Sequence, residues 1–462
     1  MPMLGVILTP HPPVLLPEVG RGREREITAT SQAMCTAAGK VARWNPDVLI
    51  VSSPHTILYG DYFHISPGHG AAGDMSAFGA PQVRIEARYD TPLRDEIVRR
   101  AQNAGLKAGT LGQRDPSLDH GVLIPLYFLC KAGINCPIVR MGLSGFSPLD
   151  HYRLGQCVAE AVEALGRRAV FVASGDLSHK LKFDGPYGFA PEGPLFDNMV
   201  TQAMASGDFL NFLTMDASLC ERAAECGLRS FQMMAGALDG LAVTPHLLSH
   251  EGPFGVGYAV ALFPVTGRDE SRCFAAPYER ARCARLKERR AREDPWVQLA
   301  RLSLETYVHT GHCLDHLPDA LPRELTGQAA GVFVSLHLWG RLRGCIGTIS
   351  PTQENVAWEI VQNAVSACSR DPRFSPVRAD ELPDLEYSVD VLSRPEPVDS
   401  PAQLDPKQYG VIVSCGHRRG LLLPDLDGID TVEEQLDIAR QKGGIGAGDS
   451  YKIQRFKVVR HL

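Results

Sequence analysis

Three short apolar segments of this chain are each followed, within a few residues, by a histidine: His11, His55 and His179. Short apolar runs bounded by Gly, Pro and Ser are typical of buried strands in a parallel or mixed sheet. Ligands of such sheets bind beyond the carboxyl ends of the strands, so we expect the three imidazoles to converge there. Imidazole is the commonest protein metal ligand and a proton carrier near neutral pH. The pattern therefore predicts a metal or proton-transfer site.

Strand-like and helix-like segments alternate over residues 1–265, which is the pattern of an α/β domain. The expected strands are residues 4–8, 48–51, 136–143, 169–173 and 257–265, and the expected helices include 151–165 and 195–204. We therefore expect an α/β N-terminal domain with a central mixed sheet flanked by helices.

Residues 266–294 are expected to form a charged linker or helix. Within them, residues 278–294 are dense in Arg, Lys and Glu and contain no proline or glycine. A solvated helix joining two domains is the first interpretation, and a docking helix for an acidic partner is the alternative. Residues 295–462 then mix helical and strand patterns, separated by proline-rich loops, and predict a smaller α+β domain.

The overall composition excludes several classes of protein. A net charge of −6 over 462 residues gives no basic field for nucleic acid. No apolar stretch approaches the ~20 residues that cross a bilayer, and the N-terminal residues do not resemble a secretory signal. The 12 cysteines include no CxxC pair, which argues against a zinc finger and a redox dithiol. We expect a cytoplasmic protein with free thiols that binds neither nucleic acid nor membrane.

Glu251 completes a possible ligand set with His11 and His55. Two histidines and one carboxylate on one face of a metal ion leave the opposite face open, as in non-haem Fe(II) sites that activate oxygen. The same three ligands also suit zinc.

Five motifs support this interpretation, and their order and spacing resemble the class III extradiol ring-cleaving dioxygenases, the LigB-like superfamily. The motifs are TPHPP at residues 9–13, SSPH at 52–55, DHGVLIPL at 119–126, SGDLSH at 174–179 and HEGPFGVGYA at 250–259. The implied function is Fe(II)-dependent cleavage of a catecholic small molecule, with both atoms of O2 incorporated.

The resemblance implies a role for each matching residue. His11, His55 and Glu251 match the metal ligands, His179 matches the acid–base histidine, and His120 matches the histidine beside the substrate. General acid–base work suits an imidazole whose pKa lies near neutrality. Three further residues are candidates for substrate binding, each with a plain structural alternative. They are Asp176, which could also cap a turn, and Tyr59 and Phe254, which could also pack in the core.

A competing resemblance is to the Memo family, which shares this fold, has an altered carboxylate position and is not established as ring-cleaving. It implies a metal-binding module of a radical SAM-associated modification system without ring cleavage. Relatives of the first domain often form dimers or larger complexes, so we expect a homo-oligomer.

Residues 295–462 resemble the AMMECR domain. The matching motifs are LRGCIG at 342–347, NA at 363–364, DPRF at 371–374, GLLLP at 420–424 and KGG at 442–444. This resemblance points to the AmmeMemoRadiSam system and hence to a possible radical SAM partner. Cys345 is either a nucleophile, with His417 as a conceivable base, or a buried structural thiol.

Overall fold

The computed structural model describes residues 2–339, 341–426, 428–446 and 448–462. The chain divides into two compact units, residues 1–283 and 284–462. Helix α10 (Ala275–Arg292) crosses this division and coincides with most of the charged segment expected from the sequence.

The first unit is built on a mixed sheet with the strand order β10-β11-β1-β8-β2-β7, in which β9 also pairs with β11. These strands are β1 (Met3–Thr9), β2 (Val48–Ser53), β7 (Ile138–Gly142), β8 (Ala169–Ser174), β9 (Leu241–Val243), β10 (His246–Glu251) and β11 (Tyr258–Arg268). The strands β1, β8, β2 and β7 run parallel, whereas β11 is antiparallel to β1. Thr9 pairs with Ser174 and Ser52 with Ala173, so three strands end at one edge of the sheet.

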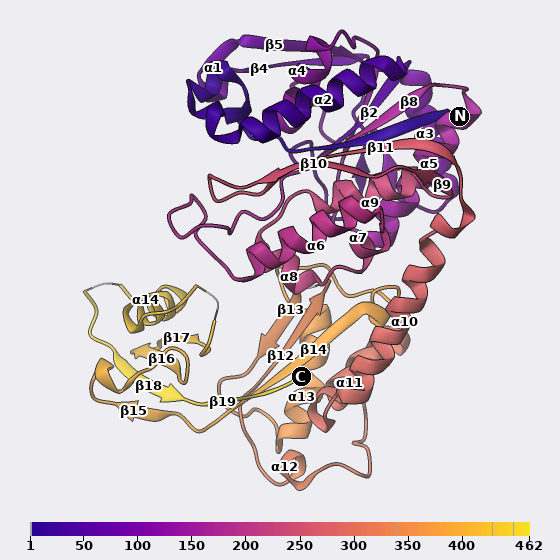
Figure 1. The fold of residues 1–462 in the computed structure, drawn as a ribbon. Helices are drawn as coiled ribbons and strands as arrows, with labels where there is room; N and C mark the ends of the chain where they lie inside the picture. The colour runs from indigo at the N-terminus through magenta and orange to yellow at the C-terminus, as the bar shows by residue number, and fades with distance from the viewer. Residues whose placement is uncertain (1, 340, 427, 447) are drawn as a thin grey trace. The chain divides into compact units, whose positions relative to one another are not determined.

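Successive side chains of the central strands enter two different cores. In β1, Val6 and Leu8 pack in one cluster of buried residues, whereas Ile7 packs in the other. Since neighbouring side chains on a strand point to opposite faces, a strand that is apolar on both faces must be covered twice. Helices α2 (Thr28–Trp44) and α4 (His120–Lys131) cover one face, and α3 (Thr91–Asn103), α5 (Pro148–Ala164) and α9 (Leu228–Ala237) cover the other (Figure 1).

Helices α5 and α9 pack with their backbones in contact. A side-chain carbon added at Gly155 would collide with the carbonyl oxygen of Met233, so glycine is required at this position. The remaining helices and strands of the unit are α1 (Pro17–Gly20), β3 (Phe63–His64), β4 (Gly70–Met75), β5 (Ala80–Arg88), β6 (Ala108–Gly109), α6 (Glu192–Ser206), α7 (Leu210–Thr214) and α8 (Ala217–Ala223), and its 3-10 turns include η3 (Ser76–Phe78).

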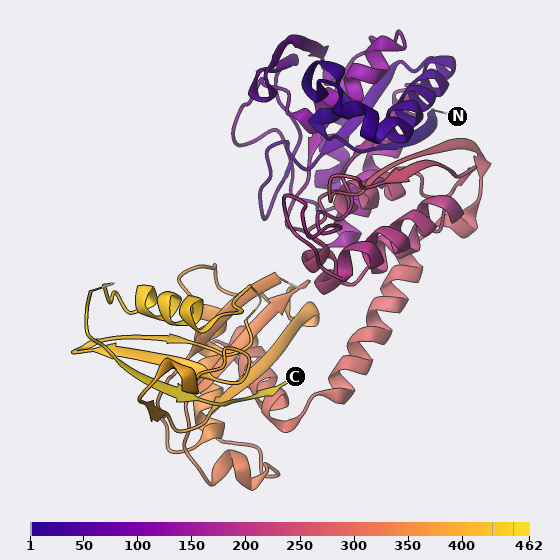
Figure 2. The same ribbon diagram turned by 60° about the vertical axis from the view of Figure 1, so that its left-hand side comes forward.

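The second unit contains two four-stranded sheets, β13-β12-β14-β19 and β15-β18-β16-β17, seen in Figures 1 and 2. The strands are β12 (Val332–Leu338), β13 (Arg341–Gly347), β14 (Leu385–Leu392), β15 (Glu396–Val398), β16 (Gly410–Cys415), β17 (Arg418–Leu422), β18 (Lys452–Phe456) and β19 (Val458–His461). Helices α11 (Pro295–Thr310), α12 (Arg323–Thr326) and α13 (Val356–Ser369) pack with the first sheet, and α14 (Val432–Lys442) packs with the second. The unit is α+β, as expected.

Several AMMECR motif residues hold α13 against the first sheet. A side chain at Gly344 would meet the carbonyl oxygen of Ala367, and Asn363 donates to the carbonyl oxygen of Val332 at 3.0 Å.

Among the described residues, no helix combines the length and the apolar composition needed to cross a membrane.

Candidate metal centre

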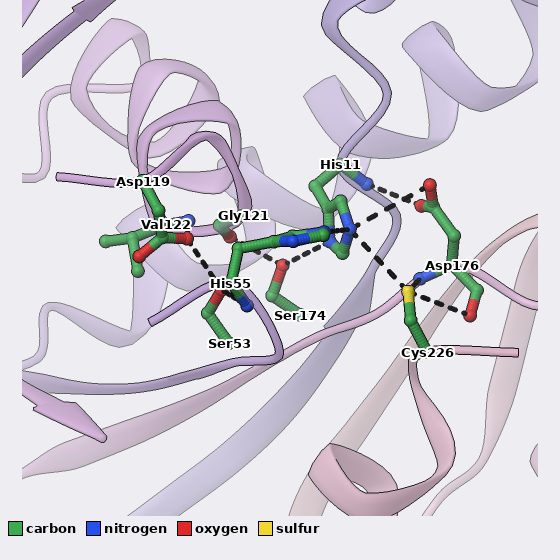
Figure 3. A network of polar contacts seen from close by, with 9 residues as sticks. All are labelled: His11, Ser53, His55, Asp119, Gly121, Val122, Ser174, Asp176 and Cys226. Atoms are coloured by element: carbon green, nitrogen blue, oxygen red, sulfur yellow. Dashed lines mark hydrogen bonds and ion pairs between the residues drawn. The ribbon is translucent and has the colours of Figure 1, made fainter. Parts of the chain in front are cut away.

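His11 and His55 meet at the edge of the sheet where β1, β2 and β8 end. Their Nε2 atoms lie 2.9 Å apart, although the residues come from strands on opposite sides of β8 (Figure 3). His11 is 2% exposed, and His55 is exposed, so solvent reaches the pair from the His55 side. The convergence expected from the strand ends is therefore present for these two imidazoles.

Cys226 is the third potential ligand in this cluster. Its Sγ lies 3.8 Å from Nε2 of His11, and one ligand atom from each of His11, His55 and Cys226 falls within 4.8 Å of the others. The thiol also accepts from the backbone N–H of Asp176 at 3.4 Å and contacts the carbonyl oxygen of Asp176 at 3.7 Å (Figure 3).

Two glycines allow the Cys226 loop to reach the β8 loop. A side-chain carbon at Gly175 would collide with the Cα atom of Gly227, so the two backbones touch only because both residues are glycine. Cys226 was not among the residues that the sequence singled out. The one sequence feature that could have drawn attention to it is that Cys226 stands beside Gly227, just before the apolar helix α9.

The structure does not bring Glu251 to the two imidazoles, which corrects the expected ligand set. Its Oε1 accepts from the backbone N–H and from the hydroxyl of Thr30, each at 2.6 Å. Thr30 lies in the first turn of α2, where backbone N–H groups have no partner within the helix and attract a carboxylate. Glu251 therefore anchors β10 to the N-terminus of α2.

Replacing Glu251 by alanine is expected to lower the free energy of unfolding by about 1 kcal/mol, the typical cost of losing a helix cap. Urea denaturation of the full chain measures this change. Thr30→Val removes the hydroxyl donor from the same carboxylate, so the double variant should lose less than the sum of the two single losses. Strictly additive losses would contradict this role of Glu251.

His120 is the first residue of α4, directly after the N-cap Asp119. Its ring centroid lies 4.1 Å from that of His55 and 5.4 Å from that of His11. The ring of Phe78, in η3, stands edge-on to His120 at 5.5 Å. The rings of His11, His55 and His120 therefore lie close together.

His179 lies on the loop that follows β8. Its backbone N–H donates to the carbonyl oxygen of Ala223 at 3.0 Å, and its ring stands edge-on to Tyr187 at 5.1 Å. Its Nδ1 is buried and has no hydrogen-bond partner among the residues that the structure describes. Burial is the main cause of the lowered pKa of His11, and the charge of His179 makes a smaller contribution in the same direction.

Asp119 ties the His55 loop to the start of α4. Its carboxylate accepts from the hydroxyls of Ser53 and Thr56, each at 2.7 Å, and from Nη2 of Arg140 at 3.0 Å. It also accepts from the backbone N–H of Val122 at 3.1 Å. Burial raises the pKa of Asp119, but the Arg140 charge and the two hydroxyl bonds outweigh this effect, so the net shift is downward. The Asp119 carboxylate thus bonds to Ser53 and Thr56, which lie on either side of His55 in the chain. It also caps the N-terminus of α4, which carries His120.

Burial lowers the pKa of His11 and of His120. Burial and then the charge of His55 lower the pKa of His11 to about 3, and burial, His55 and His11 lower the pKa of His120 to about 4. Both rings are therefore neutral at pH 7 and carry a free nitrogen lone pair. Burial also raises the pKa of Asp176 to about 6, although the backbone N–H of His11 donates to its carboxylate at 2.8 Å.

Two known family models match this chain. The family model described as the catalytic LigB subunit of aromatic ring-opening dioxygenase matches residues 5–261. The chain belongs to the LigB family. The AMMECR1 model matches residues 297–461, so a LigB domain and an AMMECR1 domain are fused in this protein.

Several proteins are similar in sequence to this chain. A protein of Clostridium acetobutylicum, CA_C1420, is 40% identical over 477 residues and covers 100% of this chain and 99% of its own length. A Thermotoga maritima protein is 53% identical over 172 residues, covering 37% of this chain and 98% of its own. Among solved structures, PH0010 of Pyrococcus horikoshii (32% identical, TM-score 0.33) covers 36% of this chain and 88% of its own, and JW3007 of Escherichia coli K12 (17% identical, TM-score 0.35) covers 56% and 99%.

The donor atoms beside Nε2 of His11 include both a thiol and a carboxylate. Among the described residues, Sγ of Cys226 lies 3.8 Å and Oδ2 of Asp176 lies 3.9 Å from Nε2 of His11, while the carboxylate of Glu251 is bonded to Thr30. Two imidazoles and a thiolate are a ligand set that would suit a metal such as zinc or copper.

Tyr59 and Phe254 have packing roles in the LigB domain. The Tyr59 hydroxyl accepts from the backbone N–H of Gln113 at 2.8 Å and occupies the space that a side chain at Gly112 would need. The ring of Phe254 lies under the guanidinium group of Arg23, 4.6 Å away. None of these contacts involves a residue of the cluster, so substrate binding by these two side chains stays a prediction.

Cys345 of the AMMECR1 domain sits in β13, where its backbone N–H donates to Asp371 at 2.9 Å and its Sγ accepts from Ser335 at 3.2 Å. The exposed His417 lies in the turn between β16 and β17, in the other sheet. The described contacts of Cys345 therefore come from its own sheet and from the loop after α13. None of these contacts is to a histidine that could act as a base.

Proposed function

We propose that the LigB domain binds one thiophilic transition-metal ion through His11, His55 and Cys226 and acts as a Memo-like metal-binding module. The observation that carries this proposal is the position of the Cys226 thiol, 3.8 Å from Nε2 of His11. In the metal-free protein the two Nε2 atoms share a hydrogen bond at 2.9 Å, and a bound ion would take the place of that shared proton.

When bound, such an ion supplies Lewis-acid strength at the exposed side of His55. The residues of the chain have separate tasks around it. Asp119 holds the His55 loop and the start of α4 together, and Asp176 holds the backbone of His11 beside the thiol. His120, whose ring lies 4.1 Å from that of His55, and His179, whose buried Nδ1 has no hydrogen-bond partner among the described residues, would be available to exchange a proton with a bound molecule.

A titration of the metal-free full-length protein with Co²⁺ tests this proposal. We expect one ion per chain and a thiolate-to-cobalt charge-transfer absorption in the near ultraviolet, which disappears when Zn²⁺ displaces the cobalt. Absence of binding, or binding without charge transfer, would contradict the proposed ligand set.

Metal binding is expected to release about one proton from Cys226 at pH 8, where ordinary imidazoles are already neutral. Burial, with Asp176 and Glu225, raises the pKa of this thiol well above its ordinary value, so the metal-free side chain is protonated. Because the bound form has lost that proton, affinity should rise about tenfold per pH unit. Calorimetry in buffers of different ionisation enthalpy counts the protons, and a count of zero at pH 8 would exclude thiolate ligation.

Ring cleavage of a catechol is the second candidate function, and His120 and His179 favour it. The ring of His120 lies 5.4 Å from that of His11, and the LigB resemblance assigns substrate contact to His120 and proton transfer to His179. Oxygen uptake by anaerobically Fe(II)-loaded protein, with a panel of catechols, distinguishes the two functions. Yellow ring-opened products that vanish in His179→Ala would establish cleavage, whereas metal binding without oxygen uptake supports the module.

A further inference from the structure

Ser174 lies between His11 and the first turn of α4. It is the last residue of β8 and is fully buried, at 0% exposure. Its Oγ lies 2.5 Å from the carbonyl oxygen of Gly121 and 2.9 Å from Nδ1 of His11 (Figure 3). One hydroxyl therefore joins a helix carbonyl to the inner nitrogen of an imidazole.

The carbonyl of Gly121 needs this partner because of a proline. In an α-helix, a carbonyl accepts from the N–H four residues later, which for Gly121 is position 125. Pro125 lies inside α4 and has no N–H to donate. The hydroxyl of Ser174 supplies the donor that the proline removes, and an unmade bond at this buried carbonyl would be costly.

The direction of these two bonds fixes the proton on His11. Two oxygens 2.5 Å apart must have a hydrogen between them, and only the Ser174 hydroxyl can provide it. With its single proton committed to Gly121, the hydroxyl can only accept from His11. Nδ1 of His11 therefore carries the proton, and Nε2 presents its lone pair to His55 and Cys226.

We propose that Pro125 and Ser174 are a pair of positioning residues that set the tautomer of His11 for metal binding. The proline frees the Gly121 carbonyl, the carbonyl orients the hydroxyl, and the hydroxyl holds the proton of His11 on Nδ1. This inference rests on the proposed metal site, because it assigns a role to the nitrogen that faces the ion. Partners of this kind on the far nitrogen of a metal-binding histidine fix both the tautomer and the ring orientation.

Long-range ¹H–¹⁵N NMR of the metal-free full-length protein reads the tautomer of His11 directly. We expect the wild-type ring to be protonated on Nδ1, and Ser174→Ala to show a mixture of the two tautomers. Zn²⁺ affinity, measured by competition with a chelator, should fall by about 10–100-fold in Ser174→Ala. The matched control is Ser230→Ala, which removes an equally buried hydroxyl whose partner is Ser52, and it should keep the wild-type affinity.

We call the series of contacts from Pro125 through the Gly121 carbonyl and the Ser174 hydroxyl to Nδ1 of His11 the relay. Pro125→Ala tests its first step, the release of the Gly121 carbonyl by the proline. The alanine N–H competes for the Gly121 carbonyl and releases the Ser174 hydroxyl, so we expect a weaker Zn²⁺ affinity and a second His11 tautomer without a lower denaturation midpoint. A residue with a purely structural role would change stability and affinity together.

The outcomes separate this inference from the proposed function. Wild-type protein that binds no Zn²⁺ would contradict the metal site itself. Wild-type protein that binds Zn²⁺, together with a Ser174→Ala variant that keeps both the wild-type affinity and a single Nδ1-protonated ring, would overturn the relay alone.

Discussion

Cys226→Ser is expected to weaken Zn²⁺ binding more than about 100-fold, beyond the cost of losing an outer-shell partner, whereas Glu251→Gln should leave it unchanged. The thiol lies within ligand distance of the two imidazoles, and the glutamate is bonded to Thr30 in α2. The ligand set expected from the sequence motifs predicts the reverse order. The two substitutions therefore decide between a thiolate site and a carboxylate site.

Competition with a chromophoric chelator measures both affinities on the full-length protein. Denaturation curves for each variant show that it is folded, and Glu251→Gln serves as the matched control because it keeps the size of the side chain. A Glu251→Gln variant that loses Zn²⁺ while Cys226→Ser retains it would restore the carboxylate as the third ligand.

Asp119→Ala is expected to lower the free energy of unfolding by about 3–5 kcal/mol, because it leaves a buried charge without its partner. Nη2 of Arg140 donates to Asp119 at 3.0 Å, and the Arg140 side chain is 1% exposed. The other contacts of this guanidinium group are to neutral oxygens, namely the Thr56 hydroxyl and the carbonyls of Asp115 and Ser117. These contacts cannot replace the negative charge.

A double-mutant cycle with Arg140→Met measures this effect by urea denaturation. We expect the double variant to be more stable than the sum of the single losses predicts, since removing both partners leaves no unpaired charge. A loss of less than 1 kcal/mol in Asp119→Ala, or additive losses in the cycle, would mean that the pair does not hold the His55 loop.

The sheet and the histidine pair followed from short-range sequence patterns. Residues such as Val6, Ile7 and Leu8 are apolar at consecutive positions because β1 is buried on both faces, and this run marks a central strand without knowledge of its neighbours. Parallel strands end at one edge, so His11 and His55 could be expected to meet. The hairpin of β4 and β5, which covers less of the core, has no comparable run of apolar residues.

The proposed third ligand could not be predicted from the sequence because its position depends on contacts between distant segments. Cys226 reaches His11 because Gly175 and Gly227 let two loops touch, and nothing near Cys226 in the sequence reports that contact. Glu251 stands in a motif suited to a metal ligand, yet its environment is decided by the first turn of α2, far away in the chain. Local motifs indicated which residue types were available, and the packing of α2 and α9 decided which of them reached the imidazoles.

X-ray absorption spectroscopy of the Zn²⁺-loaded full-length protein tests the central claim most directly. The thiolate site predicts one sulfur at about 2.3 Å together with nitrogen or oxygen ligands at about 2.0–2.1 Å, and loss of the sulfur shell in Cys226→Ser. A zinc shell made of nitrogen and oxygen alone in the wild-type protein would contradict binding by His11, His55 and Cys226.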